Sequence, residues 1–373
     1  MTSLDYLRAD LRQLDVASRR RALVPRRGRD FASNDYLALA GSARLRRAVG
    51  QALERGVAIG SGGSRLLRGN TDEHERLEDE AARFFGAEAA LFLGSGYAAN
   101  ALLLATLPQA DDLVVHDELV HASAHEGMRL GRAERAAFAH NDANAAAEAI
   151  VRWRRAGGMG TAWIAVESLY SMDGDRAPLA DLARLATREG AMLLVDEAHA
   201  TGMFGPEGRG LAAELEGCKN VLTLRTCGKA LGCEGALILG PAVVREFLIN
   251  RGRAFIYSTA PSPLMATAVR SALEIIRDEP ERRARLRALV RHAEAELAPL
   301  GVAATGSPIM PLVIGCDRRT MEVAAALQAQ GFDVRGVRPP TVPTGTSRLR
   351  LSVTLNIDEA DISALADALR DLL

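Results

Sequence analysis

The sequence predicts an α/β protein, with a mostly parallel sheet in a large domain and a smaller α+β domain toward the C-terminus. Six short apolar runs have the composition of buried strands, and helical stretches such as 74–85, 142–155 and 179–189 lie between most of them. Continuous apolar strands joined by helical crossovers are typical of parallel sheets covered on both faces. The six runs are 90–93, 112–115, 163–166, 192–195, 221–224 and 236–239.

The N-terminal region, residues 1–40, is expected to form a helix and an entry segment before the large domain at 41–263. Leucine recurs at helical spacing from Leu4 to Leu14, which predicts an amphipathic helix over residues 2–22. Residues 31–39 show no such periodicity, so we expect an irregular segment there.

The character of the chain changes after Pro263, where we place the smaller domain at 264–373. Two helical stretches, 264–278 and 280–298, come first. The later segments alternate between strand-like and helical patterns, which gives an α+β domain of ordinary size. These segments are strand 310–314, helix 320–330, the extended stretches 332–337 and 347–353, and helix 358–372.

The composition is that of a globular protein, and it disfavours several partners. Of 373 residues, 48% are hydrophobic and 25% are charged, with a net charge of −1. This balance gives no electrostatic reason to expect nucleic acid as a partner. No apolar run approaches the roughly 18 residues that span a bilayer, so no membrane association is expected. Asp5, Asp10 and Asp15 interrupt the N-terminal apolar residues, which is unlike a signal peptide.

The four cysteines form no CxxC pair and no cluster with metal-ligand spacing, so we expect no metal site. We expect reduced thiols and a cytoplasmic location. Cys227 and Cys233 flank Lys229 and are expected to be small buried residues.

Arginines cluster at 19–21 and 26–29. The favoured interpretation is a solvated helix end. The alternative is a docking point for an anionic group such as a phosphorylated acyl carrier.

Lysine is rare in this chain, which has only Lys219 and Lys229 against 44 arginines. An ammonium can lose its proton and become a nucleophilic amine, whereas a guanidinium cannot. Lys219 is expected to be a surface charge. Lys229 lies among small apolar residues in a constrained turn, which favours a Schiff-base lysine for a carbonyl compound.

Polar residues follow three of the predicted strands and should meet at one sheet edge. Glu167 follows one strand, Asp196 and His199 follow the next, and Thr226 and Lys229 follow the third. Ligands of parallel sheets bind at the carboxyl ends of the strands. An Asp paired with a pyridinium nitrogen makes that ring an electron sink. A strand-end Asp is often only a helix cap, but together these residues point to pyridoxal phosphate.

Two further features would suit that cofactor. Gly96 and Tyr97 follow a strand and open a helix, so their backbone N–H groups would form a phosphate site. His121 follows the next strand and would stack on a planar ring. Each is weak alone, because glycine turns before helices are common and a helix-start histidine is as often structural.

The chain resembles the α-oxoamine synthases, which are fold-type I pyridoxal-phosphate enzymes. The resemblance covers about residues 30–355 in order. Its motifs are Ser33–Leu37, Gly60–Arg65, Gly96–Asn100, His121–Ser123, Ser171–Asp175, Asp196–Gly202, Thr226–Lys229 and Arg338–Pro343. The sequence departs from the family pattern at Arg65 and Glu234, which we expect to alter the acyl-chain pocket.

The resemblance implies roles for individual residues. Lys229 would hold the cofactor and carry the proton, Asp196 would pair with the ring nitrogen, and His121 would stack on the ring. The remaining roles concern the ring oxygen, the phosphate and the substrate. His199 and Ser171 would contact the oxygen side, and Thr226, Gly96 and Tyr97 would bind the phosphate. Ser258 or Thr259 would reach the phosphate in a partner subunit. Arg350 would bind the amino-acid carboxylate, Asn34 would also bind substrate, and Arg338 or Arg21 would meet the distal carboxylate of the acyl chain.

The reaction implied by the closest pattern, Arg338–Pro343, is decarboxylative condensation of L-alanine with a pimeloyl thioester in biotin biosynthesis, by a homodimer. Both coenzyme A and acyl carrier protein remain open as carriers. Three alternatives also remain: a glycine C-acetyltransferase or serine-using synthase of the same family, a non-catalytic pyridoxal-phosphate-binding module, and an α/β protein in which Lys229 is incidental.

Overall fold

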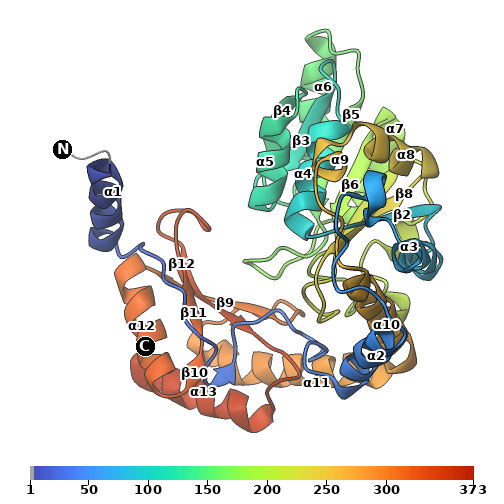
Figure 1. Cartoon of the computed structure of the whole chain (residues 1–373). Coiled ribbons are helices and arrows are strands. Elements are labelled where there is room, and N and C mark those ends of the chain that lie inside the picture. The colour runs from blue at the N-terminus through green and yellow to red at the C-terminus, as the bar shows by residue number, and fades with distance from the viewer. Residues whose placement is uncertain (1–3) are drawn as a thin grey trace. The chain divides into compact units, whose positions relative to one another are not determined.

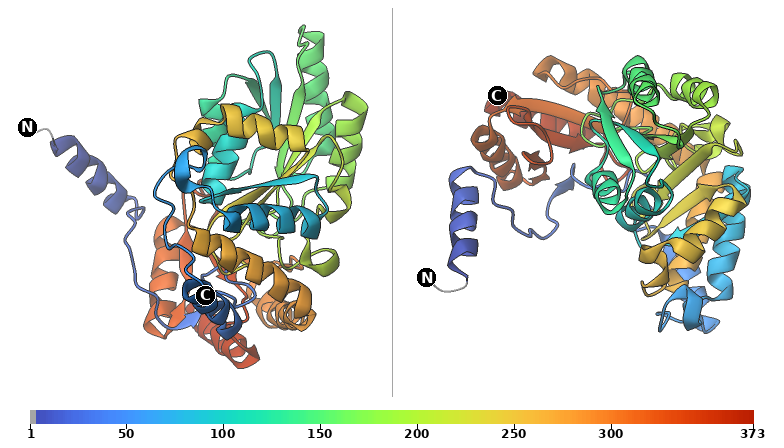
Figure 2. Two further views of the ribbon diagram at one scale, coloured as in Figure 1. Left: turned by 45° about the vertical axis from the view of Figure 1, so that its right-hand side comes forward. Right: turned by 90° about the horizontal axis from the view of Figure 1, so that it is seen from above.

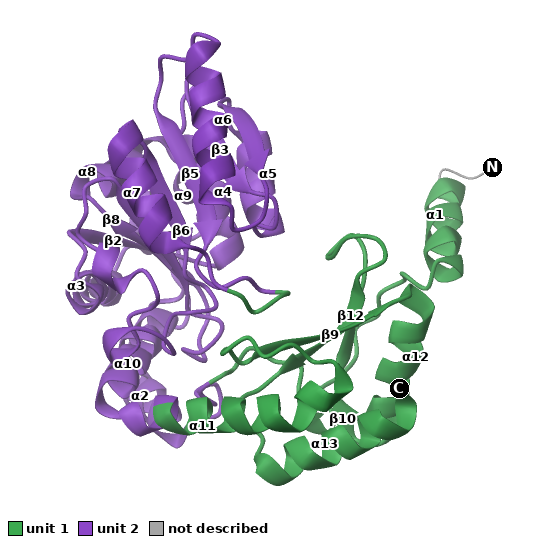
Figure 3. Cartoon of the chain, turned by 180° about the vertical axis from the view of Figure 1, so that it is seen from behind, with its two compact units in different colours: residues 1–36, 172–175, 284–373 green, residues 37–171, 176–283 purple. Residues whose placement is uncertain are grey.

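The computed structural model describes residues 4–373, which divide into two compact units (Figure 3). Unit 2 comprises residues 37–171 and 176–283. Unit 1 comprises the chain up to Tyr36, the short segment Met172–Asp175, and residues 284–373.

Unit 2 is built on a seven-stranded sheet in the order β2-β8-β7-β6-β5-β3-β4 (Figure 1). Only β8 runs antiparallel to its two neighbours, so the remaining strands all run in one direction. The predicted mostly parallel sheet is therefore confirmed. Its strands are β2 (Ala89–Leu93), β3 (Leu113–Asp117), β4 (Glu134–Phe138), β5 (Ala162–Glu167), β6 (Met192–Asp196), β7 (Val221–Thr226) and β8 (Ala236–Gly240).

Helices pack on both faces of this sheet, which explains why its strands are continuously apolar. Along β5, Trp163 and Ala165 join a core cluster with helices α4 and α5, whereas Ile164 and Val166 join a second cluster with α6 and α7. Alternate side chains of one strand thus serve opposite cores. The helices of unit 2 are α2 (Ala43–Glu54), α3 (Asp72–Phe85), α4 (Gly96–Thr106), α5 (Ala122–Leu130), α6 (Ala143–Arg155), α7 (Leu179–Glu189), α8 (Ala242–Arg251), α9 (Arg253–Ile256) and α10 (Pro263–Asp278), with short turns η1 (Arg65–Gly69), η2 (Pro206–Gly208) and η3 (Ala213–Leu215).

The six predicted strands are all present, but sequence inspection missed β4. This strand lies at the edge of the sheet and pairs only with β3. Only Phe138 of its five residues is buried, so the strand lacks the apolar run by which the others were recognised.

Unit 1 contains a three-stranded antiparallel sheet in the order β11-β12-β9 and a small parallel pair, β1 with β10. The central strand β12 carries Arg348 and Arg350, which share one face because strand side chains alternate. The strands are β1 (Arg29–Asp30), β9 (Ile309–Gly315), β10 (Phe332–Asp333), β11 (Arg335–Val337) and β12 (Ser347–Ser352); the helices are α1 (Asp5–Val16), the C-terminal part of α11 (Pro280–Leu297), η4 (Ala298–Leu300), α12 (Asp317–Ala329) and α13 (Glu359–Leu372).

The boundary between the units differs from the expected one at residue 263. Unit 2 extends to Arg283, so helix α10 belongs to it. The reason is packing: α10 contacts α2 and α3 and buries nine side chains, including Val269 and Ile276. The N-terminal segment also forms no separate part, because residues up to Tyr36 belong to unit 1.

Helix α1 is shorter than predicted and projects from the rest of unit 1 (Figure 2). It ends at Val16 and buries none of its residues; residues 2 and 3 of the predicted helix lie outside the described part of the chain. In the arginine cluster after it, Arg19 pairs with Asp317 at 2.6 Å and Arg20 with Asp15 at 2.7 Å. These ion pairs favour the structural interpretation of the cluster.

Candidate active site

Lys229 lies in the turn after β7, and its Nζ is 2.7 Å from Nε2 of His199. Lys229 is half-buried and His199 is buried. The turn is closed by backbone hydrogen bonds, in which the N–H of Gly232 donates to the Lys229 carbonyl. Gly232 has φ of +64°, and a Cβ there would lie 2.3 Å from the Ala40 nitrogen, so only glycine fits. The turn therefore fixes where the lysine amine emerges.

The two cysteines that flank Lys229 differ in burial. Cys227 is buried as expected, whereas Cys233 is only partly buried. Both are free thiols.

Asp196 ends β6 and is buried, with both carboxylate oxygens hydrogen-bonded. Nδ2 of Asn100 donates to one oxygen at 2.7 Å, and the backbone N–H of Ala198 donates to the other at 2.9 Å. These two hydrogen bonds fix the orientation of the carboxylate. Asn100 also donates to Oγ of Ser123 at 3.1 Å, while its own buried Oδ1 has no hydrogen-bond partner among the described residues.

His121 caps the N-terminus of α5 through its ring. The backbone N–H of Ser123 donates to Nδ1 at 3.2 Å, and Oγ of Ser123 lies 2.7 Å from the same nitrogen. Burial lowers the pKa of His121; the carboxylate of Asp196 opposes this effect and the ammonium of Lys229 adds to it. His121 is thus a neutral imidazole that lies within electrostatic range of both groups.

Glu167 is a member of this cluster to which the sequence analysis gave no role. It ends β5 directly beside Asp196 in the sheet register and is buried. Burial, followed by the neighbouring Asp196 carboxylate, raises the pKa of Glu167 to about 8. The backbone N–H groups of Ser171 and His121 bond its carboxyl, yet its Oε1 has no hydrogen-bond partner in the described chain. The signal in the sequence was its position directly after the predicted strand 163–166.

The N-terminus of α4 adjoins Thr226, which ends β7. Ser95 caps this helix by accepting from the N–H of Ala98 at 3.1 Å, so Gly96 and Tyr97 occupy its first turn. A Cβ on Gly96 would lie 3.5 Å from the side chain of Thr226, which is ordinary contact distance. A helix N-terminus beside a hydroxyl is a suitable environment for a phosphate group.

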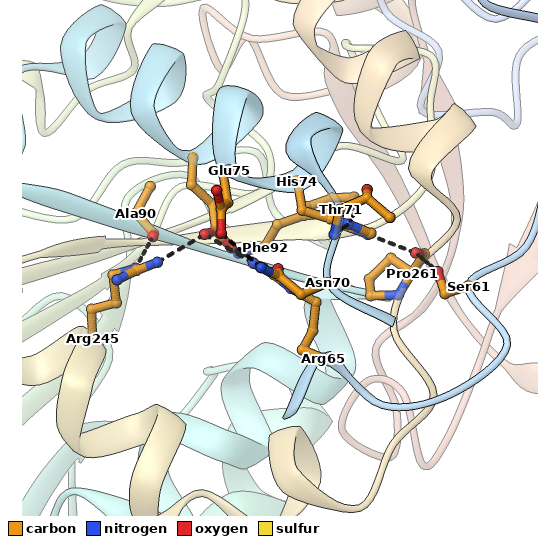
Figure 4. A network of polar contacts seen from close by, with 11 residues as sticks. Ser61, Arg65, Asn70, Thr71, His74, Glu75, Ala90, Phe92, Arg245 and Pro261 are labelled. Carbon is orange, nitrogen blue, oxygen red and sulfur yellow. Dashed lines mark hydrogen bonds and ion pairs between the residues drawn. The ribbon is translucent and has the colours of Figure 1, made fainter. Parts of the chain in front are cut away.

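Ser258 and Thr259 are exposed and lie in the segment after α9, which is tied to residues 59–74 (Figure 4). The N–H of Ala260 donates to the Gly63 carbonyl at 2.9 Å. The carbonyl of Pro261 accepts from Oγ of Ser61 at 2.6 Å and from Nε2 of His74 at 2.8 Å. These hydrogen bonds hold the two segments together.

The same network corrects the expectation for Arg65. Its guanidinium is buried and binds the carboxylate of Glu78 at 2.8 and 3.1 Å, as well as Oδ1 of Asn70 at 2.6 Å (Figure 4). Arg65 therefore anchors the loop internally, and its buried guanidinium is committed to Glu78 and Asn70. Glu234, the second departure from the family pattern, is exposed.

Arg350 and Asn34 come together in unit 1. The guanidinium of Arg350 donates to Oδ1 of Asn34 at 3.0 Å, to the hydroxyl of Tyr36 at 3.3 Å and to Oγ of Ser352 at 2.8 Å. All three acceptors are neutral, and together they orient the buried guanidinium. Burial raises the pKa of Tyr36, against the influence of Arg350, and keeps its hydroxyl neutral.

Arg338 and Arg21 also lie near each other in unit 1. The buried guanidinium of Arg338 donates to the Arg20 carbonyl at 2.6 Å, while the exposed Arg21 donates to Oγ1 of Thr341 at 3.3 Å. Burial, then repulsion from Arg21, lowers the pKa of Arg338. Its buried Nε has no hydrogen-bond partner among the described residues. Two adjoining cations of this kind are a suitable environment for an anion.

The predicted residues thus fall into two groups. Unit 2 brings Lys229, His199, Asp196 and His121 together at the carboxyl ends of its strands, and it also holds the Gly96–Thr226 pair, Ser171 and Ser258–Thr259. Unit 1 holds Arg350, Asn34, Arg338 and Arg21. Residues 4–373 contain no cluster of side chains suited to a metal ion and no helix long and apolar enough to cross a membrane.

Comparison with known proteins gives full-length matches. The family model for class I and II aminotransferases matches residues 28–369. An 8-amino-7-oxononanoate synthase of Anaeromyxobacter dehalogenans is 43% identical over 390 residues, which cover 99% of this chain and 97% of the relative. Among solved structures, a serine palmitoyltransferase of S. paucimobilis with bound PLP-myriocin is 25% identical with a TM-score of 0.90, covering 100% of this chain and 97% of that one. An 8-amino-7-oxononanoate synthase of Francisella tularensis is 25% identical with a TM-score of 0.76, covering 92% and 97%.

Proposed function

The chain belongs to the class I and II aminotransferase family, and on this basis we propose that it condenses L-alanine with a pimeloyl thioester, with loss of carbon dioxide, to give 8-amino-7-oxononanoate for biotin biosynthesis. The observation that carries the proposal is the 43% identity to a synthase of that name over 99% of the chain. The cluster of Lys229, His199 and Asp196 supplies the chemical groups that such a reaction needs.

The donor set of unit 2 fits pyridoxal phosphate. Lys229 offers an amine for its carbonyl carbon, and the carboxylate of Asp196, oriented by two hydrogen bonds, offers a partner for its ring nitrogen. The first turn of α4 and the hydroxyl of Thr226 would hold the phosphate. When bound, the cofactor supplies an electron sink that stabilises negative charge at the alanine Cα.

Lys229 is the residue that would move the proton at the alanine Cα. A lysine acts as a base only when its amine is neutral. His199, 2.7 Å away, would orient the amine, and the neutral ring of His121 would lie against the cofactor. Ser171 would contact the oxygen side of the ring together with His199.

The substrate-binding residues would come from unit 1. Arg350 would bind the alanine carboxylate, because a planar guanidinium suits bidentate binding and its three bonds to neutral oxygens hold it in one orientation. Asn34 would assist Arg350. Arg338 with Arg21 would bind the distal carboxylate of the pimeloyl chain, since they form a pair of adjoining cations.

We propose a homodimer in which Ser258 or Thr259 reaches the phosphate bound by the partner subunit. Ile59, Leu66, Leu67 and Tyr257 expose large apolar side chains on the segments that hydrogen bonds tie to Ser258 and Thr259. These large apolar side chains would be covered in such an interface. The four free thiols are consistent with a reducing, cytoplasmic location.

A serine-using synthase is the second candidate. The observation that favours it is the structural likeness to serine palmitoyltransferase, with a TM-score of 0.90 against 0.76 for the Francisella synthase. The sequence identity to the biotin-pathway relatives favours the first candidate.

The decisive experiment is a product assay. The protein is incubated with pyridoxal phosphate, with L-alanine, glycine or L-serine, and with pimeloyl-coenzyme A, pimeloyl-acyl carrier protein or palmitoyl-coenzyme A. We expect 8-amino-7-oxononanoate and carbon dioxide with L-alanine and a pimeloyl thioester. Preferential turnover of L-serine with palmitoyl-coenzyme A would overturn the first candidate in favour of the second. Binding of the cofactor without turnover of any pair would leave only a non-catalytic binding module.

A further inference from the structure

The segment 257–262 connects α9 to α10 as irregular backbone and carries the exposed residues Ser258 and Thr259. An irregular segment must find partners for its polar backbone groups outside helix and strand ladders. Here the partners come from residues 59–74, which belong to unit 2 together with the segment. The conformation of the segment therefore depends on these few contacts.

His74 binds the segment from the first turn of α3. Its Nε2 lies 2.8 Å from the carbonyl oxygen of Pro261 (Figure 4). A carbonyl oxygen only accepts hydrogen bonds, so Nε2 carries a proton and donates it. At the other edge of the ring, the backbone N–H of Thr71 donates to Nδ1 at 3.3 Å. The imidazole thus bridges the start of α3 and the segment 257–262, with one nitrogen bonded to each.

The His74 side chain is completely buried and serves as a neutral bridge. Burial lowers the pKa of His74, and the hydrogen bond to Pro261 opposes this effect. The neighbouring charges of Arg65 and Glu78 are paired with each other at 2.8 and 3.1 Å. A neutral ring that bonds a backbone group through each nitrogen contributes geometry rather than charge.

Three further contacts hold the segment beside His74. Oγ of Ser61 donates to the same Pro261 carbonyl at 2.6 Å. The N–H of Ala260 donates to the Gly63 carbonyl at 2.9 Å. A Cβ on Gly69 would lie 2.9 Å from the Cβ of Ala260, so the turn η1 packs closely against the segment. The backbone that directly follows the two exposed hydroxyl residues is therefore fixed at successive positions.

Glu78 anchors this arrangement to the central sheet. Its carboxylate accepts from the backbone N–H of Phe92 in β2 at 2.8 Å and from the guanidinium of Arg245 at 3.1 Å. The same carboxylate binds Arg65, which donates to Oδ1 of Asn70 and so ties the end of η1 to the sheet (Figure 4). The residues that hold the segment 257–262 thus rest on a buried, charged support.

We propose that His74 and Ser61 are positioning residues, which fix the segment 257–262 through the Pro261 carbonyl and hold Ser258 or Thr259 in place for the phosphate bound by the partner subunit. The inference rests on the proposed function, because these two hydroxyl groups bind the cofactor only in the proposed homodimer. The effect of the buried His74 would pass through the backbone of the segment.

The first test compares His74→Leu with His74→Gln. Glutamine has an amide N–H that can donate to the Pro261 carbonyl, whereas leucine has no donor. Ser61→Ala removes the second donor. The matched controls are His292→Leu, in α11 of unit 1, and Thr187→Ala, which removes an exposed hydroxyl that donates to a backbone carbonyl within α7.

Hydrogen exchange is measured by mass spectrometry on the full-length proteins, in peptides that contain Ala260. The amide of Ala260 reports the order of the segment, because it donates to the Gly63 carbonyl. We expect its exchange to accelerate about fivefold or more in His74→Leu and in Ser61→Ala, the equivalent of one lost hydrogen bond. Exchange in His74→Gln and in both controls should stay within about twofold of the wild type.

Titration of the absorbance of bound pyridoxal phosphate tests the positioning role on the same proteins. We expect the affinity to fall about fivefold in His74→Leu and to return close to the wild-type value in His74→Gln. A Ser258→Ala, Thr259→Val protein should also bind the cofactor less tightly. In that background His74→Leu should cause no further loss, because His74 acts through the two hydroxyl groups.

Each outcome supports or contradicts a separate step. Unchanged exchange in Ser61→Ala and His74→Leu would overturn the pinning, and Ser61→Ala alone decides it should His74→Leu fail to fold. An equal loss of affinity from His74→Leu with and without the two hydroxyl groups would show a purely structural role. Wild-type affinity in Ser258→Ala, Thr259→Val would overturn the positioning role too. Neither measurement uses a substrate, so failure to make 8-amino-7-oxononanoate would refute the proposed reaction alone.

Discussion

Two charged clusters adjoin at the carboxyl ends of β6 and β7, and they differ in how their charges are paired. Asp196 and Lys229 belong to the candidate active site, whereas the next residue after Asp196, Glu197, pairs with Arg225 at 3.1 Å. The side chains of Arg225 and Glu197 have no exposed surface. In the active-site cluster, by contrast, Glu167 and Asp196 place two carboxyl groups side by side in the sheet register.

Arg225 lies between two carboxylates. It binds Glu216 as well as Glu197, donates to the Arg209 carbonyl and lies 4.1 Å from the ring centroid of Phe85. Glu197 accepts in turn from the N–H of Ala212 at 3.0 Å. The comparison shows how one pair of strands can support an ion-pair network and, beside it, a cluster in which burial and the neighbouring Asp196 raise the pKa of Glu167.

The largest effect is expected from Lys229→Ala, which removes the reactive amine. Turnover should fall by about a thousandfold or more, because loss of a general base alone typically costs two to four orders of magnitude. The free energy of unfolding should stay within about 1 kcal/mol of the wild type, since Lys229 is only half-buried. Lys219→Ala, at the other and exposed lysine, is the control. A Lys229→Ala protein with wild-type turnover would refute the assignment.

Arg225→Met tests the contribution of the buried Arg225 cluster to stability. The substitution leaves Glu197 and Glu216 buried without their cation, so the free energy of unfolding should fall by about 3–5 kcal/mol. The measurement is urea unfolding. Arg188→Met, which removes an exposed pair with Glu189, should cost about 1 kcal/mol or less. Equal costs for the two variants would show that the buried network is not the stabilising one.

Asn100→Ala probes the support of Asp196. The carboxylate would lose the donor at 2.7 Å and become a weaker partner for the ring nitrogen. Affinity for pyridoxal phosphate should decrease about tenfold, the equivalent of one hydrogen bond to a charged group. Titration of the absorbance of the bound cofactor measures the change. Asn250→Ala, at an exposed position, serves as the control and should leave the affinity unchanged; an equal loss in both would argue against a specific role.

Glu167→Gln should produce the smallest effect, a change in pH dependence. The pKa of Glu167 rises from 4.5 to about 8 on folding, so the native state holds more protons than the unfolded state between these values. The contribution of this group to the free energy of unfolding therefore declines as the pH rises through that window. Glutamine cannot ionise, so the free energy of unfolding of the variant should decline less steeply with pH in this window.

Urea unfolding at several pH values measures the slope, with the exposed Glu148→Gln as the control. A slope in Glu167→Gln identical to that of the wild type would show that Glu167 is ionised in the folded protein.

Most of the candidate active-site cluster could be located from the sequence, because parallel strands end at the same edge of a sheet. Asp196, His199, Thr226 and Lys229 could be grouped on that basis alone. Asn100 could not, since nothing in a helix sequence indicates that its amide reaches a carboxylate on β6. The pairing of Arg225 with Glu197 and Glu216 was also hidden, because it depends on which strand neighbours face each other.

The unit boundary and the assignment of Met172–Asp175 to unit 1 escaped prediction for a related reason. Local periodicity identifies helix α10 but not the unit on which it packs. Likewise, the sequence of Met172–Asp175 is that of an ordinary loop after a strand. Its place in unit 1 follows from contacts such as those of Arg348 and Gly174, which the sequence does not show.

The scarcity of lysine has a practical consequence for handling the protein. Lys219 is exposed in the turn before β7, whereas Lys229 is half-buried in contact with His199. Amine-directed bioconjugation with a bulky reagent should therefore modify Lys219 in preference to Lys229. A fluorophore or a surface tether could be attached at this one side chain, and the reactive amine of the candidate active site would stay available.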